Sequence, residues 1–131
     1  MAARQVLINA RPFDSAAGTV GPLSAIVIDG GRIAEVLPGS PRVDDAQSID
    51  AGGRVVLPGL IDAHVHVTAT THDLTHLGLQ PPSLITAETS VVMRGMLHRG
   101  FTTVRDAAGA DYGLQEAQAR GIFEGPRLFI A

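Results

Sequence analysis

The first part of the chain alternates short apolar runs with polar and glycine-rich breaks, a pattern that is typical of small β structure. A strand is predicted over residues 4–10, and a hairpin over residues 24–39, where the letters DGG supply the turn. Residues 40–47 are polar and predict a loop. A second short strand pair is predicted over residues 48–59, with GG at its turn. Residues 1–57 therefore predict a small, mainly antiparallel β-sandwich-like segment.

The pattern changes after Pro58, where the apolar residues begin to recur at helical spacing between short β-branched runs. Residues 60–67 predict a buried strand, and the polar stretch that follows predicts a loop. The order strand, helix, strand, helix, strand favours a parallel α/β unit over residues 58–131. Ser83 is the predicted N-cap of its first helix. The remaining predicted elements are an amphipathic helix over 83–100, a strand over 101–107, a helix over 111–121 and a strand over 126–131.

Two histidines, His64 and His66, stand two positions apart in the apolar run GLIDAHVHV. Side chains on a strand alternate between faces, so both imidazoles are predicted on one face and Val65 and Val67 on the other. Two neutral imidazole nitrogens held side by side are able to bind one zinc ion, at about 2.0–2.1 Å. The alternative is a pair of ordinary polar residues on a half-exposed strand. We expect the imidazoles to be buried and to need partners, which favours the metal site.

The amino-acid composition and net charge exclude several classes of function for this chain. The chain has 131 residues, of which 45% are hydrophobic and 18% charged, which suits one modest core. A formal net charge of −3 and scattered arginines argue against a nucleic-acid surface. The absence of cysteine excludes disulfides, thiolate ligands and a cysteine nucleophile. Because no signal-peptide core and no apolar run of transmembrane length are present, we expect a cytoplasmic protein that has no membrane partner.

Three segments of the chain resemble the start of an amidohydrolase-superfamily enzyme. They are VVLPGLIDAHVH (55–66), GFTTVRDAAGAD (100–111) and GPRLFIA (125–131), and a β-rich segment precedes them. The resemblance covers nearly the whole chain and is greatest to the branch that contains imidazolonepropionase-like and prolidase-like enzymes. Members of the superfamily join a composite β-sandwich, built from both chain termini, to a (β/α)8 barrel. The resemblance therefore implies an incomplete β-sandwich over 1–57 and the first two and a half βα units of a TIM-type barrel over 58–131.

The resemblance also implies a metal. Enzymes of the superfamily use one or two divalent ions, usually zinc, to activate water, and an H-x-H pair at the end of the first barrel strand supplies two ligands. That role carries over to His64 and His66. The other ligands come from later strands: a carbamylated lysine or a glutamate, two more histidines and an aspartate. The chain contains no lysine, and a complete barrel takes about 250 residues. We therefore expect this chain to be the front portion of an enzyme and to be inactive alone.

Five further residues are candidates for the surroundings of the site. Asp62 is predicted either to accept an imidazole N–H from the metal-binding pair or to cap a neighbouring loop. His72 and His76 are predicted as an exposed loop pair, with a lining of the substrate pocket as the alternative, since this loop follows the first barrel strand. Arg105 and Asp106 end the second strand, where an ion pair that organises the loop is favoured over a catalytic pair.

Three functions remain open at this point. The first is the N-terminal segment of a metal-dependent hydrolase that activates water to cleave a C–N bond in an amide, a cyclic amide or a dipeptide. The second is a truncated, non-catalytic fragment. The third is a deaminase of the same superfamily, which would use the same histidine pair. A small-molecule substrate is expected in the enzymatic cases, and a homo-oligomer is left open.

Overall fold

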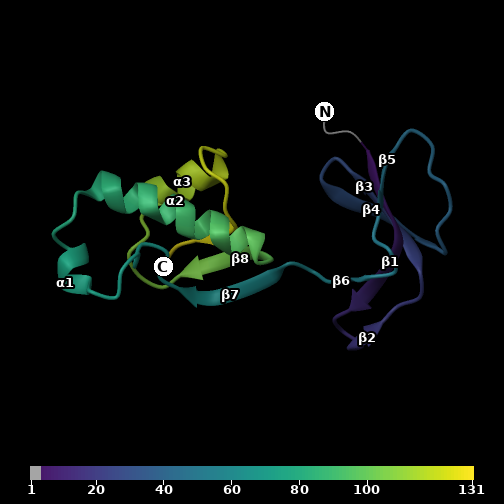
Figure 1. Ribbon diagram of the computed structural model, residues 1–131, viewed down its shortest axis with the longest axis horizontal. Coiled ribbons are helices and arrows are strands. Elements are labelled where there is room, and N and C mark those ends of the chain that lie inside the picture. Colours follow the sequence, from purple (N-terminus) through teal and green to yellow (C-terminus); the bar gives the residue numbers. More distant parts are fainter. Residues whose placement is uncertain (1–3) are drawn as a thin grey trace. The chain divides into compact units, whose positions relative to one another are not determined.

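A computed structural model describes residues 4–131 of the chain. The chain divides into two compact units, Met1–Pro58 and Gly59–Ala131. Each unit has its own sheet and its own cluster of buried apolar side chains. The first sheet is mainly antiparallel and the second is parallel (Figure 1). No helix within residues 4–131 is long and apolar enough to cross a membrane.

The described part of the N-terminal unit forms one sheet of six strands. In chain order, these strands are β1 (Gln5–Asp14), β2 (Thr19–Val20), β3 (Ser24–Asp29), β4 (Arg32–Pro38), β5 (Gln47–Asp50) and β6 (Val55–Val56). The path β2-β1-β3-β4 is antiparallel, whereas β5 and β6 each pair with β1 in parallel. The prediction that residues 48–59 form a strand pair is therefore wrong, because β5 and β6 each bond to the long β1 instead.

The hairpin predicted over residues 24–39 is confirmed. β3 and β4 pair antiparallel around a two-residue turn in which Gly30 and Gly31 have φ values of 55° and 75°. Both values lie in the left-handed region that glycine adopts without a steric penalty, as this class of hairpin turn requires. The predicted loop after the hairpin is also observed, since no helix or strand occurs between the end of β4 and the start of β5.

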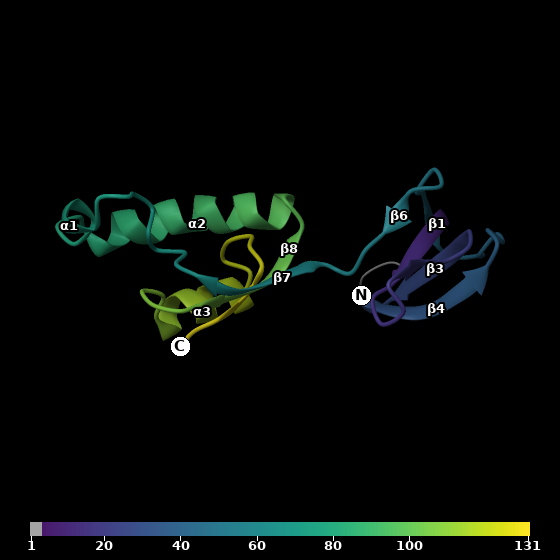
Figure 2. The ribbon, with the colours of Figure 1, turned by 90° about the horizontal axis from the view of Figure 1, so that it is seen from below.

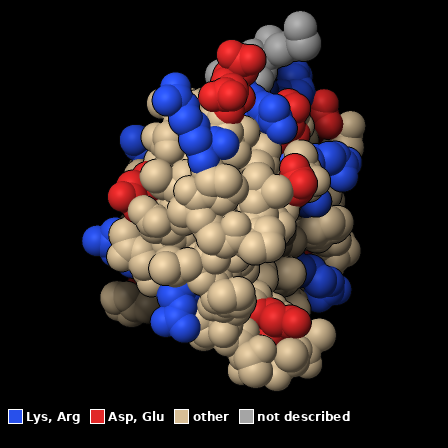
Figure 3. Space-filling view, turned by 90° about the vertical axis from the view of Figure 1, so that its right-hand side faces the viewer, with Lys and Arg blue, Asp and Glu red and all other residues tan. Residues whose placement is uncertain are grey.

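Burial in the N-terminal unit is concentrated on β1 and β3. Val6 and Val27 lie at the centre of the cluster, beside Ala25. In contrast, Ile33 and Val36 on β4 are exposed. The face of this unit seen in Figure 3 is largely uncharged at its centre, with arginine and acidic side chains around the margin.

One carboxylate ties a bend in β1 to the turn after β5. Asn9 has a φ of 54°, and its side-chain amide donates to Oδ1 of Asp50 at 3.0 Å. The main-chain N–H of Gly52 donates to the same oxygen at 2.7 Å. The hydrogen bond from Asn9, followed by that from Gly52 and the charge of Arg54, lowers the pKa of Asp50 below its ordinary value of 3.8.

The substitution Asn9→Gly is expected to raise the pKa of Asp50 toward 3.8. Glycine keeps the positive φ without strain, so the change removes only the side-chain hydrogen bond. Because the folded pKa is below the unfolded one, Asp50 stabilises the native state above pH 3.8, and this contribution is lost as the pH falls through the folded pKa. An NMR titration of the Asp50 carboxyl in both proteins measures the shift. Equal pKa values would contradict the role assigned to Asn9.

The C-terminal unit is a parallel βαβαβ unit, as predicted. Its elements are β7 (Leu60–Val65), α1 (Leu74–Leu77), α2 (Pro82–His98), β8 (Phe101–Asp106), α3 (Tyr112–Ala119) and β9 (Arg127–Phe129). The strands pair in the order β7-β8-β9. Helices α2 and α3 cover the same face of this sheet (Figure 1). In the view from below, α2 and α3 are side by side and β7 is seen running between them (Figure 2). The short α1 lies in the stretch predicted as a loop.

The ends of the helices follow local chemistry, with one correction. The predicted N-cap, Ser83, lies inside α2, which begins one residue earlier and has Pro81 at its N-cap position. A proline in the first turn is tolerated because its missing N–H would have no partner within the helix. Gly100, with a φ of 94°, follows the end of α2. Asp111 caps α3 by accepting the N–H of Leu114 at 2.9 Å.

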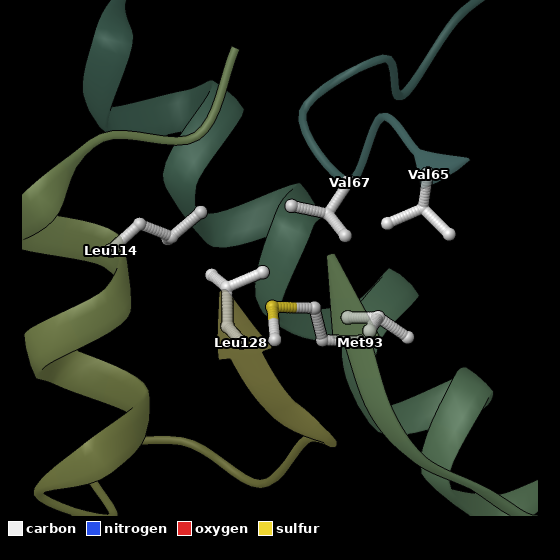
Figure 4. Packing of buried hydrophobic residues seen from close by; sticks show 6 residues of the cluster. Val65, Val67, Met93, Leu114 and Leu128 are labelled. Carbon is white, nitrogen blue, oxygen red and sulfur yellow. The ribbon is translucent and has the colours of Figure 1, made fainter. Parts of the chain in front are cut away.

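The core of the C-terminal unit lies between the sheet and its two helices. Met93 of α2 is fully buried, and its side chain points toward Leu128 of β9 (Figure 4). The other buried members of the cluster are Val65 of β7, Val67 just beyond that strand, Val104 of β8 and Leu114 of α3. This packing fixes which side of β7 faces away from the helices.

Gly59→Ala is expected to destabilise the C-terminal unit by about 1 kcal/mol, the lower end of the overpacking range, because Gly59 and Thr102 are both exposed. A Cβ at position 59 would overlap the Thr102 side chain, whose own Cβ would lie 2.7 Å away. Thr102 is β-branched and sits in β8, so it has little freedom to move aside. Chemical denaturation measures the change. Gly78→Ala is the control, because a Cβ there would meet nothing closer than 3.6 Å, and a similar loss in both variants would contradict the prediction.

Candidate metal centre

The end of β7 confirms the predicted alternation of side chains. Val65 and Val67 are buried in the core, whereas His64 and His66 are exposed. The strand is shorter than predicted and ends at Val65, so His66 is the first residue beyond it. β7 runs parallel to β8, which places both histidines at the carboxyl end of a parallel strand. The expectation of buried imidazoles is wrong, because both helices pack on the opposite face of the sheet.

The two imidazoles are close enough to share one ion. Their ring centroids are 5.3 Å apart, and the ring planes meet at 82°. Two imidazoles that share a tetrahedral zinc at about 2.0–2.1 Å have centroids roughly 5 Å apart. The separation of the His64 and His66 rings is therefore that of two ligands on one zinc ion.

A main-chain carbonyl orients one of the rings. Nδ1 of His66 lies 3.1 Å from the carbonyl oxygen of Ala108, in the loop after β8. A carbonyl only accepts, so Nδ1 carries the proton and donates. The lone pair of His66 is then on Nε2, the nitrogen that remains for a metal. This is the arrangement in which a metal-ligating histidine is held by its second nitrogen.

The neighbourhood of His64 differs from either prediction for Asp62. The Asp62 carboxylate accepts the main-chain N–H of His64 at 3.0 Å, not an imidazole N–H and not a donor from another loop. The pairing of β7 with β8 shifts register between Asp62 and Val65. Asp62 therefore stabilises the irregular end of the strand that carries the pair, and a role for it beside a bound metal stays a prediction.

Asp106 was predicted to form an ion pair with Arg105, and this is wrong. Arg105 is exposed, whereas Asp106 is 1% exposed and directs its carboxylate at main-chain donors. One oxygen accepts from Val67 at 2.7 Å, and the other accepts from Ala108 at 2.9 Å and Ala110 at 3.2 Å. Successive residues of a strand point to opposite faces, which separates the two charges. The sequence signal for this role was an aspartate at a strand end before four small residues.

The loops after β7 and β8 are fastened to each other and to α2. A side chain at Gly109, which has a φ of 111°, would collide with Thr68. Glycine at this position thus allows the two loops to approach closely. The hydroxyl of Thr70 donates to Glu88 of α2 at 2.6 Å. These contacts fix the loop that begins at His66.

The predicted loop pair, His72 and His76, is exposed. His76 lies in α1, and its main-chain N–H donates to Asp73, the N-cap residue of that short helix. A pocket of about 380 Å³ lies between α1, the start of α2 and the loops after β7 and β8. Neither His72 nor His76 lines this pocket, and a place for them in the substrate pocket stays a prediction. The walls of the pocket include Thr68, which lies two positions after His66, and Gly109, which follows Ala108, the residue whose carbonyl contacts His66.

The histidine pair is not completed by a third ligand nearby. Across residues 4–131, no group of three or more histidine, aspartate or glutamate side chains is arranged to hold a metal ion. Structural and catalytic zinc sites use at least three protein ligands. Within the described residues, this site therefore supplies two ligands only.

Comparison with known proteins identifies the family. The sequence model of the amidohydrolase family matches residues 47–120, which is more than half of the chain. The chain belongs to the amidohydrolase family. The matched region runs from β5 through α3 and includes the histidine pair and the Asp106 loop. The resemblance seen in the sequence motifs is thereby confirmed.

Relatives of this amidohydrolase chain have several activities. A prolidase solved in complex with N-methylphosphonate-L-proline is 40% identical, with a TM-score of 0.91 over 97% of this chain and 31% of its own. Adenine deaminase from Chelativorans sp. (strain BNC1) is 30% identical over 114 residues, 86% of this chain and 18% of its own. Imidazolonepropionase from Rhizobium rhizogenes is 39% identical over 67 residues, 48% of this chain and 16% of its own. The chain thus spans about a third or less of the length of these relatives.

Proposed function

We propose that the chain is the N-terminal segment of a metal-dependent hydrolase, in which His64 and His66 supply two ligands to a divalent ion. The observation that carries the proposal is the imidazole pair at the carboxyl end of β7, with centroids 5.3 Å apart, in a chain of the amidohydrolase family. In the complete enzyme, residues 58–131 would form the first βα units of a (β/α)8 barrel. Functional residues of such barrels lie at this end of the strands.

The ion proposed for this site is zinc, one or two in the complete enzyme. When bound, such an ion lowers the pKa of its water to about 7 and polarises the carbonyl that is attacked. The chain itself orients the ligands: the Ala108 carbonyl holds Nδ1 of His66, and the Asp62 carboxylate holds the main chain at His64. Arg105 is exposed on the face of β8 opposite buried Val104 and Asp106. A guanidinium there suits an anionic group of a small-molecule substrate.

The proposed reaction is hydrolysis of a C–N bond in an amide, a cyclic amide or a dipeptide. The similarity to a prolidase supports a dipeptide, and the similarity to imidazolonepropionase supports a cyclic amide. Deamination is the second candidate, because an adenine deaminase is 30% identical over 86% of this chain. A non-catalytic fragment is the remaining alternative, and it differs from both enzymes in needing no metal.

The native chain is expected to bind zinc weakly, and the double variant His64→Ala, His66→Ala is expected to lose about tenfold or more in affinity. Loss of an interaction that merely supports a ligand already weakens metal sites by about 10–100-fold, and this variant removes both ligands. Isothermal titration with zinc at neutral pH measures the difference. The control is the double variant His72→Ala, His76→Ala, which removes two exposed imidazoles from the segment around α1. Equal affinities in native and His64/His66-substituted chains would overturn the proposed site.

A further inference from the structure

We propose that Asp106 is the positioning residue for His66, an inference that rests on the proposed function of the histidine pair. The contact is indirect. Asp106 holds the main chain on both sides of the imidazole: at Val67, next to the histidine, and at Ala108, whose carbonyl accepts from the ring. One buried carboxylate thus spans the loop that carries the ligand and the loop that orients it.

The burial of Asp106 supports a dedicated role. Its side chain is 1% exposed, and a buried carboxylate is costly unless its oxygens are satisfied. Three main-chain N–H groups satisfy it, at 2.7 Å from Val67, 2.9 Å from Ala108 and 3.2 Å from Ala110. Hydrogen bonds from main-chain N–H groups to an ionised carboxylate are among the stronger ones. The carboxylate therefore fixes the main chain of both loops at the positions that set the ring of His66.

The chemistry of aspartate is required at this position. Both oxygens of the carboxylate accept, which matches donors arriving at each oxygen from different loops. An asparagine offers one accepting oxygen and one NH2 group, so it would direct a donor at either Val67 or Ala108. The Ala108 carbonyl would then no longer be held against Nδ1 of His66. An imidazole that loses this acceptor is free to place its proton on Nε2, the nitrogen that the metal needs.

The experiment is carried out on the 131-residue chain, first without metal. Nitrogen-15 NMR at a pH where His66 is neutral is expected to show its proton on Nδ1 in the native protein. In Asp106→Asn, the signals are expected to shift toward the Nε2-protonated form, and zinc affinity is expected to fall by about 10–100-fold. The control is Asp111→Asn, which alters a carboxylate that accepts a main-chain N–H in the same unit without contacting His66. It is expected to leave both readouts unchanged.

Three results would overturn the inference: a native His66 with its proton on Nε2, a folded Asp106→Asn with unchanged tautomer and zinc affinity, or the same shift in Asp111→Asn. If Asp106→Asn does not fold, hydrogen exchange in the native protein decides. Slow exchange of the Val67 and Ala108 amides is expected, and unprotected exchange of either would overturn the inference. The tautomer of His66 and the amide exchange are measured without metal, so they test the role of Asp106 alone. The proposed function is tested separately, by zinc binding in the double variant of His64 and His66 to alanine.

Discussion

Met93→Ala is expected to lower the free energy of unfolding of the C-terminal unit by about 2–5 kcal/mol, the range for truncating a buried methionine. Met93 is 0% exposed and lies in the cluster that joins α2 to β9. Gly125 packs directly against it, with room for no side chain, since a Cβ there would lie 2.9 Å from the Cβ of Met93. The close approach of the Gly125 main chain on one side leaves that wall of the cavity unable to collapse through a side-chain rearrangement.

The loss at Met93 is large compared with the whole stability of a small unit, which for a domain of this size is a few kcal/mol. Thermal or chemical unfolding monitored by circular dichroism measures it. Met93→Leu keeps most of the volume and is expected to cost less than about 1.5 kcal/mol. Val91→Ala, on the exposed side of the same helix at 70% exposure, is expected to change stability by about 0.5 kcal/mol or less. A cost at Val91 equal to that at Met93 would contradict the assigned core.

The features that the sequence predicts well are those determined by neighbouring residues. The period-two pattern around His64 and His66 predicted their common face, because strand geometry alternates side chains whatever lies farther away. The glycine pair of the β3–β4 turn was likewise readable, since a positive φ is a local requirement of that turn.

The features that the sequence did not predict depend on distant partners. The partner of β5 is β1, and Gln47 pairs with Gln5 across 42 positions of the chain. A two-glycine turn after β5 allows a local hairpin equally well, so local propensity does not choose between the two. The exposure of the histidines was also missed, because an apolar sequence environment does not reveal which face the helices cover.

The role of Asp106 shows the same limit within the candidate site. An Arg-Asp pair at a strand end suggested an ion pair, but adjacent strand residues face opposite ways. Its actual partners, Val67 and Ala108, offer main-chain N–H groups, which every residue type except proline possesses. The alanine-rich loop carries no side-chain signal for this contact. The two proposed ligands were therefore predictable from sequence, and the main-chain contacts of Asp106 were not.

With zinc added, the 131-residue chain is expected to hydrolyse amides and dipeptides no faster than free zinc does. It supplies two histidines, no third ligand within residues 4–131 and no lysine. A catalytic zinc needs three protein ligands to fix its geometry while leaving one position open. A positioned base is also needed to move the proton to the leaving group, and its contribution alone is about 10²–10⁴-fold. Losses within a catalytic unit are not additive, so a site lacking several parts falls to the background rate.

The decisive measurement compares four samples at the same zinc concentration and with the same panel of amides and dipeptides. They are the native chain, the double variant of His64 and His66 to alanine, the control double variant of His72 and His76 to alanine, and buffer alone. Equal rates in all four are the expected result. Turnover above buffer that survives in the control and disappears in the His64/His66 variant would contradict the prediction, because it would mean that two ligands suffice or that a homo-oligomer completes the site. Light scattering of an active sample would separate these cases, since only the second requires association. Under the proposed function, a polypeptide that adds the remaining barrel strands is expected to raise the rate by orders of magnitude, because those strands would supply further ligands and a base beside His64 and His66.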